Sequence, residues 1–429
     1  MNVSREQLTQ RLAAELGSAA VSSDSASLTA HRIDGITPRL FCEPDSAEQV
    51  SAVLRVCREA KAVVAPWGGG TATNLGNLPR ALDVIVSTAK LDKVVEHDAA
   101  NLTATVQSGI RLAALQKALA PQRQLAPFDP PLPERATIGG IVAANLNGPR
   151  RGYYGNVRDL VIGMKVALAT GEVIKAGGKV VKNVAGYDMC KLFTGALGTL
   201  GIITEVTLRM AALPDESAVI SACGTLPQAF QFAEAIIGAP LLPAAVSLNS
   251  NGVVSNSQEG WQLTILCEGF AETIARQIRD IQTLADSIGL PARCVEPQAS
   301  AQQWQQLCNF PARPSSVVYR VTVPRTELRS VVATTGNWNP TPAILADVAS
   351  AVVWIVYPAS EAATQLFPKL IDLAKERRGH AVMFAAPAEV KAGFDVWGPP
   401  PPSFALMRKL KQQFDPQGIL NPGRFLQNL

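Results

Sequence analysis

Apolar residues recur at regular spacings along the first 120 residues, and the spacing changes from one segment to the next. Between 47 and 60 the apolar positions follow a helical period, and Pro44-Asp45-Ser46 precedes them as a helix start signal. Between 102 and 107 threonine alternates with valine or alanine, which predicts a half-buried strand. Similar patterns predict the remaining elements: a capped helix beginning near Ser4, strands at 62–65 and 83–87, and a helix at 111–119. From residue 47 the predicted order is therefore helix, strand, loop, strand, strand, helix.

The rest of the chain continues as a mixture of strands and helices. Two apolar runs at 160–169 and 172–175 flank Thr170-Gly171 and predict a β-hairpin, and the β-branched run at 202–208 predicts another strand. Beyond residue 212 we expect helices at 230–237 and 273–285, and strands at 263–267, 317–323 and 352–357. The pattern therefore predicts an α+β fold, with sheet and helices packed together after residue 212.

Length and composition indicate an ordinary globular protein. With 429 residues the chain exceeds the usual size of one domain, so we expect two folding units. A net charge of +4 is small and favours neither nucleic-acid binding nor a polybasic membrane anchor. The run that comes nearest to a membrane span, Ala343 to Tyr357, is too short and contains Asp347, so it predicts a buried strand or helix. Hydrophobic residues at 47% are a weak sign that a partner covers part of the surface.

The cysteines indicate a reducing compartment. Their number is odd and none forms the close pairs of zinc or iron–sulfur sites: the seven are Cys42, Cys57, Cys190, Cys223, Cys267, Cys294 and Cys308. At the N-terminus Ser4 and Gln7 are spaced as a helix capping box, which is not the pattern of a secretory signal. We therefore expect reduced, mostly buried thiols, a cytoplasmic location and no bound metal.

The segment Pro-Trp-Gly-Gly-Gly-Thr-Ala-Thr-Asn at 66–74 carries the clearest chemistry. Three successive glycines allow main-chain N–H groups to approach an anion closely, which suits a pyrophosphate. Thr71 and Thr73 add hydroxyl donors, and Asn74 adds an amide that can close the turn on itself or on a ligand. The alternative is a plain glycine-rich turn between two strands.

A second segment of small residues follows a rigid, proline-rich stretch at 129–133. Residues 137–145 open with Gly139-Gly140 and predict a helix that a flat or phosphorylated ligand can approach closely, with the helix N-terminus favouring negative charge. The alternative is that the small residues only let this helix pack close to a sheet.

Two polar loops add further candidate groups. The first places Arg150 and Arg151 beside two tyrosines, which suits a nucleotide or a carboxylate, while solvated loop charges are the ordinary alternative. The second, at 179–188, offers Lys182 and Tyr187 as functional groups.

Four motifs follow one another in the first half of the chain. They are the glycine loop, Thr-Ile-Gly-Gly at 137–140, Asn-Val-Ala-Gly-Tyr-Asp at 183–188 and Leu-Gly-Thr-Leu-Gly-Ile-Ile-Thr at 197–204. In order and spacing they resemble the FAD-binding domain of the vanillyl-alcohol-oxidase family of flavoproteins, also called the PCMH type. The resemblance covers about residues 35–212. It returns at 410–424, which is similar to the tail that packs back beside the flavin in that family.

The resemblance implies a division of the chain and a cofactor. A helical segment at 1–34 would precede a two-part FAD-binding domain at 35–212, followed by an α+β cap domain at 213–385 and a C-terminal segment at 386–429 that returns to the flavin. The implied cofactor is FAD, and the implied binding residues are Pro66, Trp67, Gly68, Gly69, Gly70, Thr71, Thr73, Asn74, Pro131, Thr137, Gly139, Gly140, Ala143, Gly148, Val157, Gly201, Ile203 and Asn421. Relatives with covalent flavin use a histidine in the glycine loop or a cysteine elsewhere. Because Gly70 is followed here by threonine, we expect FAD without a covalent link.

Within the family, three segments resemble the E subunits of glycolate oxidase, also called glycolate dehydrogenase. They are Gly-Pro-Arg-Arg at 148–151, Lys-Asn-Val-Ala-Gly-Tyr-Asp at 182–188 and Lys-Gln-Gln-Phe-Asp-Pro at 411–416. This implies an FAD-binding subunit of a heteromeric enzyme that oxidises glycolate, a small 2-hydroxy acid, to glyoxylate. The implied partners are a catalytic D-type flavoprotein and an iron–sulfur F-type subunit. Such a chain would be cytoplasmic, either free or peripheral at the inner membrane through the complex.

The cap domain departs from its catalytic relatives. Those that oxidise 2-hydroxy acids carry a Gly-His-x-Gly-Asp-Gly-Asn-x-His motif that helps bind a divalent metal, whereas this chain reads Gly-His-Ala-Val-Met-Phe at 379–384. A metal site needs several such ligands, so we expect it to be missing. The candidate catalytic groups are His380 as a base, Arg320 as a carboxylate ligand, and Lys182 or Tyr187 as proton acceptors. For His380 a structural role, and for Arg320 a salt bridge, are the plain alternatives.

Three functions are left open by the sequence. The first is a flavin-carrying subunit that relays electrons or supports assembly of a heteromeric glycolate dehydrogenase. The second is a self-sufficient FAD-dependent dehydrogenase of glycolate, D-lactate or a related acid. The third is a scaffold that has lost the flavin. The missing metal motif favours the first over the second, and the complete glycine loop disfavours the third.

Overall fold

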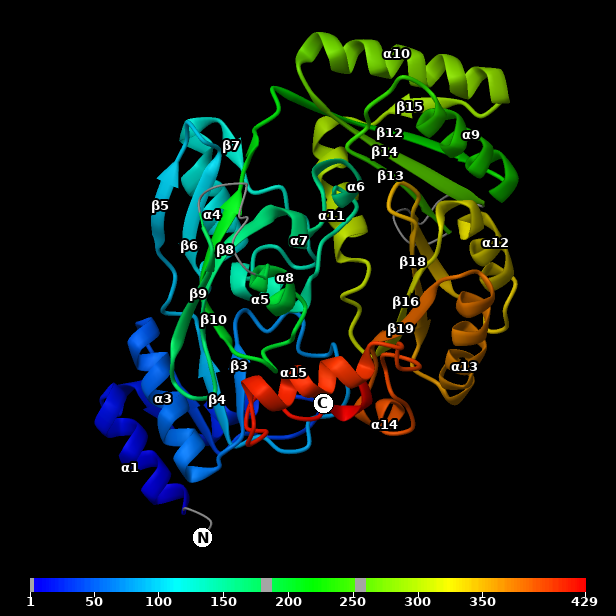
Figure 1. The fold of residues 1–429 in the computed structure, drawn as a ribbon. Coiled ribbons are helices and arrows are strands. Elements are labelled where there is room, and N and C mark those ends of the chain that lie inside the picture. Colours follow the sequence, from blue (N-terminus) through cyan, green and yellow to red (C-terminus); the bar gives the residue numbers. More distant parts are fainter. Residues whose placement is uncertain (1–3, 179–186, 251–259) are drawn as a thin grey trace.

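The computed structural model describes residues 4–178, 187–250 and 260–429, and they form two units that lie side by side (Figure 1). Lys182 lies outside the described residues. The chain begins with α1 (Arg5–Leu16), which has the predicted capping box: the Ser4 side chain accepts from the Gln7 N–H, and the Gln7 side chain accepts from the Ser4 N–H. The first unit contains two main sheets, and the second is built on one large sheet.

The first sheet carries the glycine loop. Its strand order is β1-β2-β4-β3, from β1 (Val21–Ser22), β2 (Leu40–Cys42), β3 (Val64–Trp67) and β4 (Val84–Ser87). β2 and β3 both pair in parallel with β4, so the chain must cross over between them, and α3 (Ala47–Ala60) makes that crossover. Short helices η1 (Ser18–Ala20) and α2 (Ser25–Ala30) complete the N-terminal part. The glycine loop therefore leaves the carboxyl end of a parallel strand, where ligand loops of such sheets commonly lie.

The second sheet is antiparallel throughout. Its order is β5-β6-β10-β8-β9, from β5 (Val94–Asp98), β6 (Thr103–Gln107), β8 (Val161–Ala167), β9 (Val173–Gly177) and β10 (Ile202–Arg209). The short elements of this part are α4 (Leu112–Leu119), η2 (Ala120–Gln122), β7 (Gln124–Leu125), α5 (Ile138–Ala144), α6 (Arg151–Tyr154), α7 (Val157–Leu160), α8 (Met189–Phe193) and β11 (Ala211–Ala212). Residues of α4, α5, α7 and α8 share one apolar core with the strands, which fixes α5 against the sheet.

The second unit is an eight-stranded antiparallel sheet of order β15-β12-β14-β13-β17-β18-β16-β19. Its strands are β12 (Glu216–Gly224), β13 (Ala245–Asn249), β14 (Trp261–Gly269), β15 (Ala292–Cys294), β16 (Ser316–Thr322), β17 (Ala343–Asp347), β18 (Val352–Pro358) and β19 (His380–Ala385). Its helices are α9 (Leu226–Gly238), α10 (Ala271–Ile288), α11 (Pro297–Asn309), α12 (Arg325–Gly336) and α13 (Glu361–Glu376). Figure 1 shows α12 and α13 on the outer side of the sheet and α11 between the two units.

Alternation along the strands separates the two faces of the large sheet. In β16, Val317, Tyr319 and Val321 belong to the core shared with α9, α10, α12 and α13. Val318 lies on the opposite face, in a cluster with Leu75 and Ala144 of the first unit. Because side chains of a strand alternate between faces, Arg320 is placed on the same face as Val318. The large sheet thus turns an apolar face, with one arginine in β16, toward the first unit.

The C-terminal segment returns to the first unit. After α14 (Ala388–Lys391), α15 (Phe404–Phe414) runs across the lower middle of Figure 1, and η3 (Leu426–Asn428) ends the chain. Leu420 forms a parallel bridge with Val64 at the edge of β3, where the Val64 N–H donates to Ile419 O at 2.8 Å and the Asn421 N–H donates to Val64 O at 2.8 Å. Backbone pairing therefore places Asn421 beside the strand from which the glycine loop emerges.

Arg150 and Arg151 join the two units and are largely buried. Arg150 pairs with Glu268 of β14, which is nearly buried, and its guanidinium lies 5.6 Å from the Trp304 ring centroid. Arg151 Nε donates to Ser350 Oγ at 3.0 Å and lies 3.5 Å from Asp347 Oδ2. The two side chains are therefore not solvated loop charges, and a role in binding a ligand stays a prediction.

The predicted α+β fold is confirmed, and the predicted helices and strands match observed elements within a few residues. The run Ala343 to Tyr357 forms two adjacent strands, β17 and β18, with a turn between them. Asp347 is the last residue of β17, and its carboxylate accepts a hydrogen bond from the Ser350 N–H. The same carboxylate faces Arg151 across the boundary between the units. The boundaries placed at residues 34, 212 and 385 stay predictions. In the part of the chain that the structure describes, no helix has the length and apolar character needed to cross a membrane.

Candidate functional site

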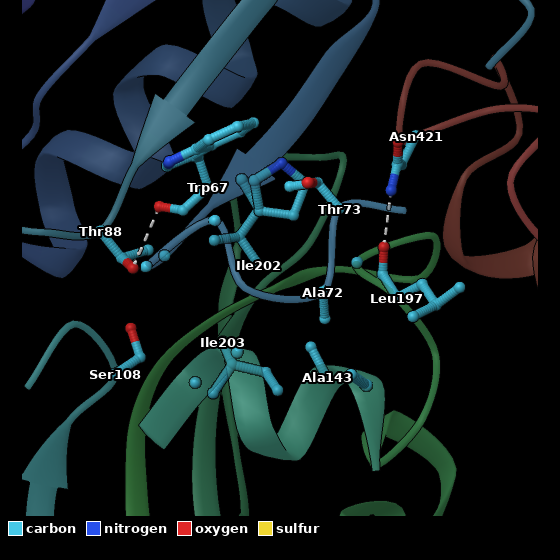
Figure 2. Close-up of a pocket in the computed structure, with 18 of the residues that line it drawn as sticks. Trp67, Ala72, Thr73, Thr88, Ser108, Ala143, Leu197, Ile202, Ile203 and Asn421 are labelled. Carbon is cyan, nitrogen blue, oxygen red and sulfur yellow. Dashed lines mark hydrogen bonds between the residues drawn. The ribbon is translucent and has the colours of Figure 1, made fainter. Parts of the chain in front are cut away.

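The main pocket lies where the glycine loop crosses over α5 (Figure 2). In this view Ala72 of the loop faces Ala143 of α5, Ser108 lies at one end, and Asn421 lies beside Leu197 at the other. Five segments form most of the walls: the loop after β3, the end of β6, α5, the segment 197–203 that leads into β10, and the C-terminal tail. Ile33 and Thr88 complete the lining. Because the tail is fixed by its bridge to Val64, the pocket depends on pairing between residues more than 350 positions apart along the chain.

Most of the predicted FAD-binding residues line this pocket. Those brought together are Pro66, Trp67, Gly68, Gly69, Gly70, Thr71, Thr73, Gly139, Gly140, Ala143, Gly201, Ile203 and Asn421. The lining also includes residues that the sequence analysis did not identify: Ile33, Ala72, Leu75, Thr88, Ser108, Ala144, Leu197, Gly198, Ile202 and Arg424. Ser108 could have been suspected, because it ends a predicted strand just before Gly109. Arg424 could also have been suspected, because it ends the segment 410–424 that resembles the returning tail of the family. Ile33 carries no local signal, since contacts between distant segments bring it here.

Two glycines are required by close backbone approach. A Cβ on Gly69 would overlap the backbone oxygen of Arg135, and a Cβ on Gly139 would lie 2.6 Å from the Cβ of Ser108. Gly139 also donates its N–H to Ser108 O at 2.7 Å, so α5 touches the end of β6 directly. The glycines therefore bring three backbone segments closer together than any other residue would allow.

The glycine loop offers a run of unused donors. Among the described residues, no acceptor receives the backbone N–H groups of residues 69–74, although the next residue, Leu75, donates to Ala72 O at 3.1 Å. Two buried side-chain atoms at the pocket are also without a partner in the described part of the chain, Ser108 Oγ and Asn421 Oδ1. Asn421 uses its other amide atom to donate to Leu197 O at 2.7 Å (Figure 2). Since backbone donors and buried polar atoms are normally satisfied, this arrangement fits an anionic ligand with several acceptors.

Five predicted residues lie outside the pocket lining. Thr137 is adjacent, because it is the N-cap of α5 and its hydroxyl, which accepts from the Gly140 N–H at 3.3 Å, lies close to Gly68. Asn74 directs its carbonyl to Lys391. The structure places the other three away from the lining: Pro131, Gly148 and Val157. Gly148 donates its N–H to Asp129 Oδ1 at 2.9 Å, and the side chain of Val157 is fully buried in the core.

A second cavity of about 490 Å³ lies between α8, β16 and α15 and shares Leu75 and Ala144 with the first. Its wall includes four cations, Arg158, Lys191, Arg320 and Lys411. Lys411 is paired with Asp415 at 2.7 Å. In the described part of the chain, no carboxylate lies within ion-pair distance of the other three. Trp397 and Leu410 add apolar surface, so the cavity suits a small organic anion.

Arg320 is the candidate catalytic residue with the clearest position. Its guanidinium lies 5.9 Å from the Trp354 ring centroid and lines the second cavity. Burial lowers its pKa to about 10, with a further contribution from the charge of Arg151, so the group stays ionised at neutral pH. The inter-unit salt bridge considered for Arg320 is not formed with any described residue.

The other candidates are not brought to either cavity. His380 begins β19 at an exposed position, where partial burial of the ring and the charge of Arg320 lower its pKa. Tyr187 is 94% exposed, and Lys182 lies outside the described residues. Among residues 4–178, 187–250 and 260–429, no three His, Cys, Asp or Glu side chains gather in a group that could hold a metal ion.

Comparisons with known proteins agree with this geometry. The family described as FAD binding domain matches residues 38–177, and the family described as FAD linked oxidases, C-terminal domain, matches residues 400–425. The two matches cover the glycine loop, α5 and the returning tail, which contribute most of the pocket lining, while the lining residues at 197–203 lie between the two matches.

Similar proteins extend over most of the chain. Glycolate oxidase subunit GlcE of Escherichia coli (strain K12) is 30% identical over 338 residues, which are 78% of this chain and 85% of that protein. Glycolate oxidase subunit GlcD of Bacillus subtilis (strain 168) is 28% identical over 423 residues, covering 90% of this chain and 88% of that protein. The structure of p-cresol methylhydroxylase with substrate bound has a TM-score of 0.74 at 17% identity and covers 98% of this chain and 96% of that chain, which shows a shared fold.

Proposed function

The chain belongs to the FAD-linked oxidases of the vanillyl-alcohol-oxidase type, the family of the glycolate oxidase subunits, and from this premise we propose that it is the FAD-binding subunit of a heteromeric glycolate dehydrogenase. In this proposal the chain relays electrons or supports assembly, and the complex oxidises glycolate to glyoxylate. The observation that carries the proposal is the similarity to subunit GlcE over 338 residues and 85% of that protein, because a match of this length is not confined to the FAD-binding part.

Different residues of the pocket would bind different parts of the cofactor. When bound, FAD supplies an acceptor for two electrons from a C–H bond next to a hydroxyl group. The free N–H groups of residues 69–74 would bind its diphosphate, and Ser108 and Asn421 would meet polar atoms of the cofactor. Ala143 and Ala144 leave room for a flat ring beside α5. The unused donors favour this reading over a scaffold that has lost the flavin.

We propose that FAD is bound without a covalent link. A covalent bond to flavin needs a histidine or cysteine side chain at the pocket. In the part of the chain that the structure describes, the pocket lining contains neither. Acid precipitation tests this directly, because the flavin should stay in the supernatant, whereas yellow colour in the protein pellet would contradict it.

The β19 region supports a subunit role. The positions after His380, where catalytic relatives are expected to carry the metal motif, form the interior of a strand in which residues 381–385 are all buried. Ala381 and Met383 pack into the helix-covered core, and Phe384 packs in the apolar cluster that faces the first unit. Apolar packing has replaced the polar side chains that such a motif would present.

The expected partners are a catalytic flavoprotein of the D type and an iron–sulfur subunit of the F type. Such partners would bring the 2-hydroxy acid and the route by which electrons leave. Under this proposal the chain works in the cytoplasm, either free or at the inner membrane through the complex. Co-purification with separately tagged partners, from cells that express all three chains, tests the assembly.

One observation favours a second function, a self-sufficient dehydrogenase of glycolate, D-lactate or a related acid. The second cavity adjoins the first and presents Arg320, Arg158 and Lys191 without carboxylate partners among the described residues. A carboxylate bound there by Arg320 would lie next to the FAD pocket, because the two cavities share Leu75 and Ala144.

An absorption spectrum separates the two functions. The chain is purified alone with its flavin, and the spectrum is recorded without oxygen before and after adding glycolate or D-lactate. We expect the flavin to stay oxidised until the partner subunits are added. Bleaching of the flavin in the chain alone would show that it is an enzyme by itself. In that case Arg320→Met should abolish bleaching while Arg313→Met, a half-buried arginine over Phe310 outside the cavity, should not.

A further inference from the structure

Three charged side chains from distant parts of the chain meet beneath the glycine loop. Asp34 comes from the N-terminal part, Lys391 from the end of α14, and Arg424 from the tail. Lys391 Nζ lies 2.8 Å from Asp34 Oδ1, and Arg424 Nη1 pairs with Asp34 Oδ2. Their side chains are 0% to 3% exposed. Two buried cations therefore share one buried carboxylate, and the trio carries a net charge of +1 when Lys391 is protonated.

Both cations bind backbone carbonyl groups at the end of the glycine loop. Lys391 donates to Asn74 O. Arg424 donates to Thr73 O and Leu75 O through one nitrogen and to Asn77 O at 2.7 Å through the other. A backbone hydrogen bond runs in the other direction: the Asn77 N–H donates to Arg424 O at 3.0 Å. Four carbonyl groups of the segment 73–77 are thus turned toward the cations.

The orientation of these carbonyls decides where the N–H groups point. In a trans peptide the carbonyl and the following N–H point in opposite directions. With the carbonyl of Thr73 held inward, the N–H of Asn74 is directed away from the cations, and it is one of the loop donors with no acceptor among the described residues. Arg424 itself lines the pocket, so its charge is close to any anion that the loop binds.

We infer that Lys391 and Arg424 are positioning residues for the diphosphate of FAD: they orient the end of the glycine loop and keep an uncompensated positive charge behind it. This rests on the proposed binding of FAD. An anion in the pocket would be attracted by the net charge of the trio, and burial weakens the screening that water would otherwise provide. Asp34 sets the spacing of the two cations and prevents the charge from reaching +2.

The charge of the trio depends on pH. Burial lowers the pKa of Lys391 to about 8, while Asp34 raises it and Arg424 lowers it further. These are the charged groups that act on Lys391. Asp395, the neighbouring carboxylate, contacts Asn77, Trp397 and Gln427 and neither cation. As the pH rises through 8, Lys391 loses its proton and the net charge of the trio falls from +1 to 0.

The effect on folding has the opposite sign. Because the pKa of Lys391 is lower in the folded chain than in the unfolded chain, the unfolded chain binds more protons between pH 8 and 10.5, and this residue's contribution to stability rises with pH. A loss of FAD above pH 8 is therefore not the result expected from unfolding at Lys391.

The test measures FAD affinity from the fluorescence of FAD released on dilution of the flavin-loaded chain, between pH 6.5 and 9.5. For the wild-type chain we expect affinity to fall about tenfold from pH 7 to pH 9, as one unit charge near the diphosphate is lost. Lys391→Met should bind FAD about tenfold more weakly than wild type at pH 7 and show no fall above it. Arg424→Met should weaken binding at every pH, because Arg424 stays charged throughout this range.

Arg151→Met is the matched control. Arg151 is also largely buried, its Nε donates to Ser350 Oγ at 3.0 Å and lies 3.5 Å from Asp347 Oδ2, and it lines neither the FAD pocket nor the second cavity. This variant should keep the wild-type pH profile of FAD affinity. Lys391→Arg keeps the positive charge at high pH and should therefore retain FAD at pH 9. This variant replaces Lys391→Met as the test if the methionine variant does not fold.

The outcomes separate this inference from the proposed function. If the wild-type chain binds FAD with the same affinity at pH 7 and 9, and Lys391→Met binds it equally well, the positioning role is overturned while FAD binding stands. A wild-type chain that holds no FAD at any pH would overturn both. An equal loss of FAD affinity in the Arg151→Met control at pH 7 would show that loss of any buried cation weakens the site, which also contradicts a specific role for Lys391.

Discussion

At the scale of single residues, the site depends on what is missing at Gly69 and Gly139 as much as on the groups that are present. The absence of a Cβ at Gly69 lets the glycine loop pass over the backbone of Arg135, and the absence of one at Gly139 lets α5 touch Ser108. Polar atoms that face the pocket, such as Ser108 Oγ and Asn421 Oδ1, gain partners only from a ligand. The effect of a substitution at this site therefore depends on whether the new side chain blocks a neighbouring backbone segment or a ligand atom.

Gly69→Asp should expel FAD. The new side chain overlaps the backbone oxygen of Arg135 and places a carboxylate beside donors that would bind a diphosphate. We expect FAD affinity to fall about a hundredfold, since a lost charged hydrogen bond costs roughly 1.5–3 kcal/mol and repulsion adds to it. Flavin content after gel filtration measures this. Gly238→Ala, where a Cβ meets nothing within 4 Å, is the control that should stay yellow. Full flavin content in Gly69→Asp would refute the loop assignment.

His380→Ala should leave FAD bound. His380 is exposed at the start of β19 and lines neither cavity, so its loss removes no contact to the cofactor. We expect flavin content and the absorption spectrum to match those of the wild type. Release of flavin from this variant would show that the start of β19 takes part in the pocket.

At the scale of elements, short segments with few internal hydrogen bonds are held by their neighbours. α5 has seven residues, too few for a stable helix alone, and it is fixed by Thr137 at its start and by the contact between Gly139 and Ser108. The tail likewise becomes ordered by pairing with Val64 at the edge of β3. Both elements line the pocket, so local capping and edge pairing control its shape.

Thr137→Ala should weaken α5. The hydroxyl of Thr137 is the N-cap that accepts from the Gly140 N–H, and losing such a cap costs about 1 kcal/mol. Chemical denaturation of the flavin-free chain should show a loss of about this size in the free energy of unfolding, with Thr137→Ser close to wild type. Equal stabilities of the alanine and serine variants would mean that the cap contributes nothing.

At the scale of the whole molecule, buried charges join parts that are far apart in the chain. Arg150 and Glu268 link the two units, and Asp34, Lys391 and Arg424 link the two ends of the chain beneath the glycine loop. Buried ion pairs are costly to desolvate and give little net stability, but they are strongly destabilising when one partner is removed. They therefore make the arrangement of the units specific.

Glu268→Gln should destabilise the contact between the units. Glu268 accepts from Arg150 and from the Tyr154 hydroxyl at 3.0 Å, and the variant leaves the largely buried Arg150 without its ion-pair partner. We expect the free energy of unfolding to fall by about 3 kcal/mol, within the range for breaking a buried pair. Denaturant titration measures the loss, and the double variant Arg150→Met with Glu268→Leu should recover a large part of it. No recovery would mean that the single change acts by another route.

The sequence by itself determined the elements and the main ligand loop of this protein. Helical and strand periods are local, so they predicted α3, β6, the hairpin of β8 and β9, and the α+β pattern of the large sheet, all of which the structure contains. The glycine loop and Gly139-Gly140 could also be identified, since close backbone approach restricts the residue type wherever it occurs.

Only the tertiary structure decided which side chains meet. Arg150 and Arg151 are equally suited to a ligand or to solvent in the sequence, and their partners Glu268 and Asp347 follow from the packing of the two units. No local pattern could show that Arg424 and Asp34 meet, because their contact is an ion pair between residues 390 positions apart. Local propensity acts over a few residues, whereas ion pairs and edge pairing act between segments that are distant in the chain. The pocket depends mainly on these contacts between distant segments.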